Sequence, residues 1–257
     1  MSRRVVVTGA SSGIGAATAR AMRHAGWEVV AVARRAERLA ALEEETGAVA
    51  FAADLTSDAD VAALLAFLKD SGPVHALAHV AGGAMGVDRV EDGSLDDWRW
   101  MYEANVLSAQ RLTAGMLPLL RDASESGNAD LLFVTSTAAQ VAYAGGGGYN
   151  AAKAAESMLV SALRLELAGE PLRVIEIAPG MVHTEEFSLN RLRGDQSGAD
   201  AVYEGVQNPL TAADVADVIR YALMAPGHVN LDLVTVRPVA QAAQHVVARG
   251  PLRVRAD

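Results

Sequence analysis

No cysteine occurs among the 257 residues of the chain. Disulfide frameworks, thiolate nucleophiles, zinc ribbons and cysteine-ligated iron–sulfur clusters are therefore excluded. A chain of this kind suits a reducing compartment, and we expect a cytoplasmic protein. The apolar residues 5–7 end at Gly9, too early for the apolar core of a signal peptide, so we interpret them as a buried first strand.

Excess positive charge and long apolar runs are also missing. The 22 basic residues stand against 31 acidic ones, so the net charge is −9 and the electrostatic footprint of a nucleic-acid-binding protein is absent. No run of 18 apolar residues occurs, so we predict no membrane-spanning segment. The expected partners are small molecules rather than nucleic acids or membranes.

Metal-ligand patterns are scarce too. His75 and His79 lie on one predicted strand, where four residues span roughly 13 Å, too far for two ligands of one ion. Neither a histidine pair on a predicted helix nor an acidic ligand cluster occurs. We therefore predict no catalytic metal and interpret His79 as a packed core residue.

Short apolar runs alternate along the chain with longer stretches rich in alanine and leucine. We predict strands over residues 4–8, 28–33, 48–53, 75–80, 130–135, 173–178 and 232–237. We predict helices near residues 14–25, 36–45, 58–70, 95–122, 149–168 and 212–224. Strands that are apolar throughout are typical of a parallel sheet covered on both faces. The alternation therefore predicts a single α/β domain over residues 1–257, with about seven strands in a doubly wound parallel sheet.

Two segments near the end of the chain are weakly patterned. Residues 185–207 are polar and interrupted by Gly194 and Gly198, so we expect a mobile substrate loop or lid over about residues 184–210. The tail over residues 241–257 is distinguished only by Arg249, Arg253 and Arg255, and we assign it no role.

The first predicted strand runs into a glycine-rich turn that opens a predicted helix. Gly9 permits the sharp turn, Gly13 allows the backbone to approach a pyrophosphate, and Gly15 allows the helix to pack closely on the strand. The helix N-terminus would meet the phosphates with free N–H groups. A purely structural turn is the alternative, but the strand–turn–helix context favours a dinucleotide site. Its predicted residues are Gly9, Ser11, Ser12, Gly13, Ile14 and Gly15.

The second predicted strand ends in Arg34-Arg35, where NAD-preferring sites place an acid that binds the ribose 2′-hydroxyl. Arginine instead suits a 2′-phosphate, so we predict NADP(H), with NAD(H) the less favoured cofactor. The alternative is that both arginines are solvated residues at the start of a helix. Asp54 and Leu55 follow the third strand, at the edge where an adenine ring would lie.

Tyr149 and Lys153 are four residues apart on a predicted helix, so their side chains share one face. Tyrosine is a poor acid at neutral pH, and a nearby ammonium lowers its pKa by stabilising the phenolate. Only two lysines occur in the chain, Lys69 and Lys153, against 22 basic residues in all. Taken alone, the two residues fit an ordinary surface pair at least as well; the choice of lysine in an arginine-rich chain, together with the polar residues described next, favours a proton-donating pair.

Two further polar residues suit the same centre. Ser136 follows the fifth predicted strand, where its hydroxyl is suited to orient a substrate oxygen. The alternative is a strand-end hydroxyl with no chemical role. Asn105, a poor helix former inside the predicted helix 95–122, is either a tolerated polar residue or the anchor of a proton relay near Lys153.

Taken together, these motifs resemble those of the short-chain dehydrogenase/reductase family over about residues 3–237. The residues that carry the resemblance are Thr8, Gly9, Gly13, Gly15, Asp54, Asn105, Ser136, Tyr149, Lys153, Pro179, Gly180, Val182 and Thr184. The resemblance implies a Rossmann-type fold and hydride exchange between a nicotinamide cofactor and an alcohol or carbonyl. It also implies a homodimer or homotetramer that pairs the long helices 95–122 and 149–168.

The resemblance implies a role for each member of a catalytic tetrad. Tyr149 would be the acid and base, and Ser136 would orient and polarise the carbonyl. Lys153 would lower the pKa of Tyr149 and hold the ribose, and Asn105 would carry the proton relay.

The resemblance also implies cofactor contacts after two other strands. Residues that would line the nicotinamide are Pro179, Gly180, Val182 and Thr184. Ala81-Gly82 would let the cofactor pass. His79 and Val80 replace the two asparagines that usually precede this Ala-Gly. Because those asparagines mainly brace the sheet, we expect activity to survive the replacement.

The substrate side is read from the residues around Tyr149 and from the segment after residue 179. Tyr143 and Met181 would either form pocket walls or simply pack the loops. Residues 179–191, 210–218, 225–230 and 236–239 look similar to the serine and 3-hydroxy-acid dehydrogenase branch of the family. That resemblance implies a small β-hydroxy acid, whose carboxylate Arg191 or Arg193 would clamp, unless both are solvated lid charges.

Two alternatives remain open at this stage. A related branch reduces larger ketones and aldehydes, such as secondary metabolites, terpenoids or sugars. A protein that senses NADP(H) without turnover is the second alternative, and the presence of Tyr149 with Lys153 disfavours it.

Overall fold

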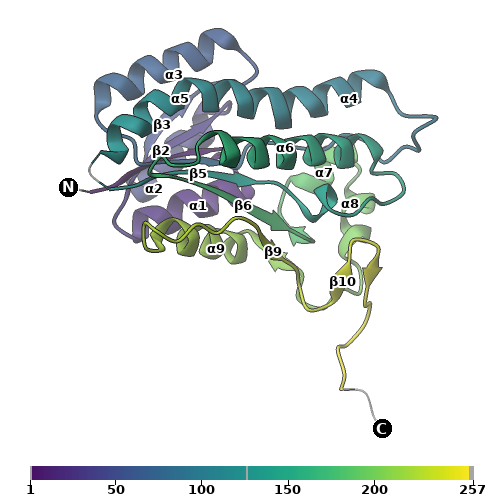
Figure 1. Ribbon diagram of the computed structural model, residues 1–257. Coiled ribbons are helices and arrows are strands. Elements are labelled where there is room, and N and C mark those ends of the chain that lie inside the picture. Colours follow the sequence, from purple (N-terminus) through teal and green to yellow (C-terminus); the bar gives the residue numbers. More distant parts are fainter. Residues whose placement is uncertain (1, 126, 255–257) are drawn as a thin grey trace.

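A parallel sheet of seven strands forms the centre of the computed structural model, which describes residues 2–125 and 127–254. The strand order is β3-β2-β1-β4-β5-β6-β9, and every neighbouring pair is parallel. The strands are β1 (Arg4–Thr8), β2 (Glu28–Ala33), β3 (Val49–Ala52), β4 (Ala76–His79), β5 (Ala129–Val134), β6 (Leu172–Pro179) and β9 (Val234–Val236). The strand order reverses between β1 and β4, so the predicted doubly wound, Rossmann-type fold class is confirmed (Figure 1).

Helices cover both faces of this sheet (Figure 1). One face carries α1 (Gly13–His24), α2 (Ala36–Thr46) and α9 (Ala212–Met224). The other face carries α3 (Asp58–Ser71), α5 (Ser108–Ser124) and α6 (Gly147–Glu166). Along β1, Val5 and Val7 belong to the first core and Val6 to the second, because successive side chains of a strand point to opposite faces.

Because each strand is buried on both faces, nearly all of its residues are apolar. This is why each strand could be recognised in the sequence as an apolar run. The strands occur where they were predicted, with ends that differ by at most two residues. In the part of the chain that the structure describes, no helix is long and apolar enough to cross a membrane.

The helix predicted over residues 95–122 is divided in the structure. It consists of α4 (Leu95–Tyr102), a π-helical turn η1 (Glu103–Leu107) and α5. The Asn105 side-chain amide donates to the carbonyl oxygen of Met101, 2.6 Å away. That carbonyl, four residues back, is the one that a regular α-helix would bond to a backbone N–H. Competition from the side chain for this acceptor favours the wider turn at Asn105.

The segment predicted as a loop or lid is more regular than its sequence suggested. It contains α7 (Phe187–Arg191) and α8 (Gln196–Tyr203), and the short strands β7 (Val182–His183) and β8 (Leu210–Thr211) pair at its base. Helices of one or two turns are too short to show an apolar period. In the predicted tail, β10 (Gln241–Ala243) pairs with β11 (Val246–Val247), and Arg255 lies outside the described residues.

A buried ion pair joins three elements at the amino edge of the sheet. Arg173 at the start of β6 donates to Asp130 at the start of β5 over 2.6 Å, and the Asp130 side chain is fully buried. The same guanidinium donates to the carbonyl oxygens of Leu223 and Ala225 at the end of α9, at 3.0 and 3.1 Å. Arg173 therefore satisfies carbonyls that the last turn of a helix leaves unpaired.

We expect Arg173→Met to destabilise the protein by about 3–5 kcal/mol, because it leaves the Asp130 carboxylate buried with a weaker partner. Arg220→Met is the matched control, since Arg220 forms an exposed pair with Asp217 worth about 0–1 kcal/mol. Urea denaturation of both variants measures the free energy of unfolding. Equal losses in the two variants would contradict a special role for the buried pair.

Candidate active site

Two backbone loops meet at the carboxyl edge of the sheet, where the strand order reverses. The Thr8 hydroxyl at the end of β1 accepts hydrogen bonds from the backbone N–H groups of Val80 and Ala81, both at 3.0 Å. A methyl group at Gly9 would lie only 2.9 Å from the Ala81 Cα, so a larger residue is excluded there. Ligands of doubly wound sheets bind in the crevice above such a reversal.

The glycine-rich turn forms a cradle of backbone at the start of α1. Gly9 and Gly13 adopt φ values of +66° and +50°, in the left-handed region that favours glycine. A methyl group at Gly15 would lie 2.2 Å from the Gly9 carbonyl oxygen, so the helix packs directly on the turn. The Ile14 side chain packs into the core below, which leaves backbone and the serine hydroxyls at the surface of the cradle.

Arg35 reaches across this cradle and meets a carboxylate that the sequence analysis missed. Its guanidinium donates to the Ser11 hydroxyl at 2.9 Å and to both oxygens of Glu186 at 2.7 and 2.9 Å. The Ser12 hydroxyl donates to the same carboxylate at 2.8 Å. The hydrogen bond from Arg35 is the main reason why the pKa of Glu186 lies below its usual range.

Arg34, predicted together with Arg35, is exposed and contributes its charge instead to the next strand end. Partial burial raises the pKa of Asp54, but hydrogen bonds from Thr56 and the charge of Arg34 more than offset it, and the pKa is lowered. The Leu55 side chain is buried in the core. Of the two residues predicted here, Asp54 is therefore the one whose side chain lies nearer the surface.

Tyr149 lies in the first turn of α6, beside the end of β5. Ser136 caps a short 3-10 turn, η2 (Thr137–Ala139), through a bond from the Ala138 N–H at 3.0 Å. Burial raises the pKa of Tyr149, while the charge of Lys153 and a hydrogen bond with Ser136 act to lower it. Burial is the larger effect, so the phenol is held protonated at neutral pH.

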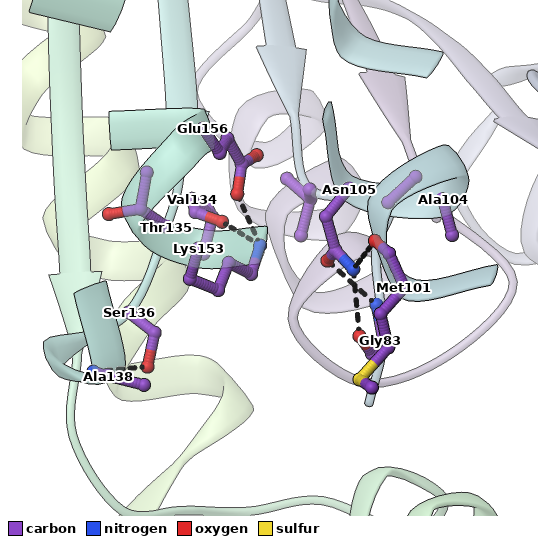
Figure 2. A network of polar contacts seen from close by, with 12 residues as sticks. Gly83, Met101, Ala104, Asn105, Val134, Thr135, Ser136, Ala138, Lys153 and Glu156 are labelled. Carbon is purple, nitrogen blue, oxygen red and sulfur yellow. Dashed lines mark hydrogen bonds and ion pairs between the residues drawn. The ribbon is translucent and has the colours of Figure 1, made fainter. Parts of the chain in front are cut away.

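Lys153 lies one turn further along α6 and points inward below Tyr149. Its ammonium donates to the Val134 carbonyl oxygen at 3.1 Å and to a Glu156 oxygen at 2.6 Å (Figure 2). Both charged side chains are at least 95% buried. Burial lowers the pKa of Lys153, but the charge and hydrogen bond of Glu156 together with the charges of Tyr149 and Glu176 more than offset this, and the pKa is raised.

Asn105 faces Lys153 across the loop that follows β4 (Figure 2). Its side-chain oxygen accepts from the Gly83 N–H at 3.1 Å, and its amide donates to the Gly83 carbonyl at 2.9 Å. A methyl group at Gly82 would lie 2.5 Å from the Asn105 oxygen and 3.3 Å from the Lys153 nitrogen. Only glycine therefore fits between the two polar side chains.

The segment after β6 closes the other side of the crevice. The Ser136 hydroxyl lies 3.5 Å from the Pro179 carbonyl oxygen. A methyl group at Gly13 would lie 3.5 Å from the Thr184 side chain, so Thr184 borders the cradle. A methyl group at Gly180 would lie 2.3 Å from the Gln241 side-chain oxygen, so Gln241 would have to move to admit a side chain there. Val182, in β7, packs partly against the core.

A small pocket lies beside Tyr149 and receives Arg191 from α7. Its lining residues include Met85, Asp88, Asp97, Trp98, Tyr149, Arg191 and the glycines at 145–148. The Arg191 guanidinium donates to the Tyr143 hydroxyl at 2.8 Å and lies 5.7 Å from the centre of the Tyr149 ring. Tyr143 therefore supports Arg191. The Met181 N–H instead donates to the Gln241 side chain at 2.8 Å, and Met181 is not among the residues that line this pocket.

Arg193 and His79 lie outside the pocket. Arg193 is exposed and pairs with Asp97. His79 is buried, stacks on Phe133 with ring centres 4.7 Å apart, and shares a 3.0 Å hydrogen bond with the Thr113 hydroxyl. Burial, together with the charge of Lys153, lowers the pKa of His79 to about 3, so the ring is neutral. Within residues 2–125 and 127–254, no cluster of three or more His, Asp or Glu side chains is suited to a metal ion.

The sequence analysis missed Glu156 and Glu186, and also Glu176, a buried residue of β6 that accepts a hydrogen bond from the Thr135 hydroxyl. A signal existed for Glu156, because it is a carboxylate three residues after Lys153 on an otherwise apolar helix face. Glu186 lies 151 residues from Arg35, and no local pattern links the two.

The profile of the short chain dehydrogenase family matches residues 3–192. An uncharacterized oxidoreductase from Mycobacterium tuberculosis is 51% identical over 98% of this chain and 97% of its own. A serine 3-dehydrogenase from Agrobacterium fabrum is 37% identical over 94% of this chain and 96% of its own.

A solved structure, the closed form of a serine dehydrogenase complexed with NADP+, superposes with a TM-score of 0.86. It is 31% identical, and the match covers 99% of this chain and all of the other. Both the sequence profile and full-length relatives thus agree with the fold and the motifs. The chain belongs to the short-chain dehydrogenase family of oxidoreductases.

Proposed function

We propose that this protein is an NADP(H)-dependent dehydrogenase that interconverts the hydroxyl and carbonyl groups of a small β-hydroxy acid. The observation that carries the substrate class is the position of Arg191 beside Tyr149. The serine dehydrogenases to which the chain is similar support the same class, because serine combines a carboxylate with a β-hydroxyl group.

The cradle fits a phosphate-bearing dinucleotide. Gly9, Gly13 and Gly15 leave backbone where side chains would obstruct a ligand, and the N-terminus of α1 favours negative charge. Ser11 and Arg35 would hold a 2′-phosphate, with Arg34 nearby, and this donor set supports NADP(H) over NAD(H). When bound, NADP(H) supplies or accepts the hydride at its nicotinamide ring.

The residues beside the nicotinamide would then manage the proton and the substrate oxygen. In alcohol oxidation, the deprotonated Tyr149 oxygen accepts the proton of the substrate hydroxyl while the hydride leaves the carbon that carries this hydroxyl. Ser136 orients that oxygen by hydrogen bonding. In carbonyl reduction both transfers reverse, and the Tyr149 phenol donates its proton. Lys153 and Asn105 form the polar surface on the inner side of Tyr149.

Arg191 is suited to a carboxylate. Its nitrogens donate to Gly86 O, Tyr143 Oη and Gly145 O at 3.0, 2.8 and 3.1 Å, which fixes the guanidinium with two of its five N–H groups to spare. Among the described residues, no carboxylate forms an ion pair with Arg191, whereas Arg193 pairs with Asp97. A small acid bound here would place its hydroxyl close to Tyr149.

The first test compares 3-hydroxybutyrate with its uncharged methyl ester in NADP+ reduction. Serine, 3-hydroxypropionate and bulky secondary alcohols complete the panel. We expect Arg191→Met to raise KM for the acids by about 10–100-fold, the range for one lost bond to a charged group, and to change the ester much less. Arg193→Met is the control and should leave both KM values unchanged.

Turnover of bulky alcohols alone would overturn the β-hydroxy acid assignment and retain the family. Equal effects of Arg191→Met on acid and ester would show that the arginine only supports the loop around Tyr143.

We expect Tyr149→Phe to lower kcat by about 10²–10⁴-fold, because it removes the group that exchanges the proton. The dissociation constant for NADPH, measured by fluorescence titration, should stay within about twofold of the value for the unmodified protein. The reason is that the variant removes a neutral phenol hydroxyl and no charge. Unchanged turnover in the variant would remove Tyr149 from the mechanism. NADPH binding without turnover of any alcohol by the unmodified protein would favour a sensor.

We expect Arg35→Leu to weaken NADP+ binding by about tenfold or more and NAD+ binding much less, since the lost contact is to the 2′-phosphate. Arg34→Leu, at an exposed position, should have a smaller effect on the same ratio. Calorimetric titration of both cofactors measures the two dissociation constants. A parallel loss for NADP+ and NAD+ in Arg35→Leu would contradict phosphate recognition by this residue.

A further inference from the structure

A carboxylate contacts the lysine of the active site from the protein interior. Glu156 lies three residues after Lys153 on α6, and its side chain is 1% exposed. The same face of α6 is otherwise apolar, with Ala152, Val160 and Leu163 buried against the sheet. Acidic side chains are rarely buried to this extent without a partner.

We propose that Glu156 is a positioning residue of the active site, which fixes the Lys153 ammonium and balances its charge, and so sets how strongly Lys153 acts on the Tyr149 hydroxyl. This inference deepens the proposed function and rests on it for the role of Tyr149.

The first support is the geometry around the ammonium. Two acceptors, the Val134 carbonyl at 3.1 Å and the Glu156 carboxylate at 2.6 Å, hold the Lys153 nitrogen from the sheet side (Figure 2). A lysine carries three N–H donors, so these bonds leave one for the side of Gly82 and Asn105. A flexible four-carbon side chain is thereby held in one place without a contact from the ligand side.

The second support is the charge balance of this interior. The titratable groups that face Lys153 are Tyr149 and Glu156 from α6, Glu176 from β6 and His79 from β4. Glu176 is also buried and accepts a 2.7 Å hydrogen bond from the Thr135 hydroxyl. Since His79 is neutral, Lys153 is the cation among these groups, and the carboxylates lie on its inner side.

The third support is the protonation state of Glu156. Burial raises its pKa to about 6, while Lys153 limits the rise and Glu176 adds to it. The carboxylate is therefore mainly ionised at neutral pH, and its negative charge keeps Lys153 protonated against the effect of burial. Its direct effect on Tyr149 is no larger than that of the neighbouring Tyr143, so Glu156 acts on Tyr149 through Lys153.

Glu156→Gln separates charge from position, because glutamine keeps an acceptor oxygen at the same distance from the chain. With the negative charge removed, burial lowers the pKa of Lys153, so the ammonium loses its proton before Tyr149 ionises and no longer stabilises the tyrosinate. We therefore expect the Tyr149 titration to shift to higher pH. Alcohol oxidation needs the tyrosinate, so its pH profile should shift up in the same direction, with an unchanged plateau.

The experiment is an ultraviolet absorbance titration of tyrosinate, with the curve of a Tyr149→Phe counterpart subtracted from each variant. Glu166→Gln is the control, since Glu166 lies exposed at the end of the same helix. An upward shift in Glu156→Gln and none in Glu166→Gln supports the proposal. Unchanged titration in Glu156→Gln, a downward shift, or equal shifts in both variants overturns it.

The absorbance titration needs no substrate, so it tests Glu156 even if the β-hydroxy acid assignment fails. Circular dichroism checks that each variant is folded. If Glu156→Gln does not fold, Glu156→Asp withdraws the carboxylate from Lys153 by one methylene. A smaller upward shift is then expected, and an unchanged titration or a downward shift in Glu156→Asp overturns the proposal.

Discussion

The close approach of two backbone loops is the constraint on which the candidate site depends. The turn after β1 and the loop after β4 touch at Gly9 and Ala81, and the Thr8 hydroxyl holds them together. That contact places the β4 loop over Asn105 and Lys153. Gly82 lies between these two side chains, at a position where a methyl group would approach both of them. A bulkier residue at either glycine would push apart the cradle and the proton-handling residues at once.

Opposed electrostatic effects then define the state of Tyr149. Burial favours the neutral phenol, and Lys153 and Ser136 favour the phenolate. The sequence analysis considered only the ammonium, because i to i+4 spacing makes that pair visible. It omitted the desolvation that a buried first turn of α6 imposes, and the carboxylate that shares the ammonium. The acid strength of Tyr149 therefore depends on its burial, on Lys153 and on the carboxylate behind Lys153, and not on one neighbour alone.

Most of the fold was accessible to sequence reasoning because its strands are buried on both faces, as Val5, Val6 and Val7 illustrate. The π turn was not, since the polarity of Asn105 signals an anomaly but not which carbonyl its amide takes. Helices α7 and α8 were missed because they are short. In the candidate site, residues that follow strands could be placed together by topology, whereas Glu186 reaches Arg35 through a tertiary contact. The catalytic and binding roles themselves stay predictions.

The contact between Glu186 and the cradle has a consequence for the entropy of ligand binding. A surface arginine samples many rotamers, and an anion that immobilises it loses part of its binding free energy to that ordering. Here the carboxylate already holds the Arg35 guanidinium against Ser11, and Ser12 shares the same anion. A phosphate that replaced the carboxylate would exchange one anion for another on a donor set that is already ordered, and the freed carboxylate would release the start of α7.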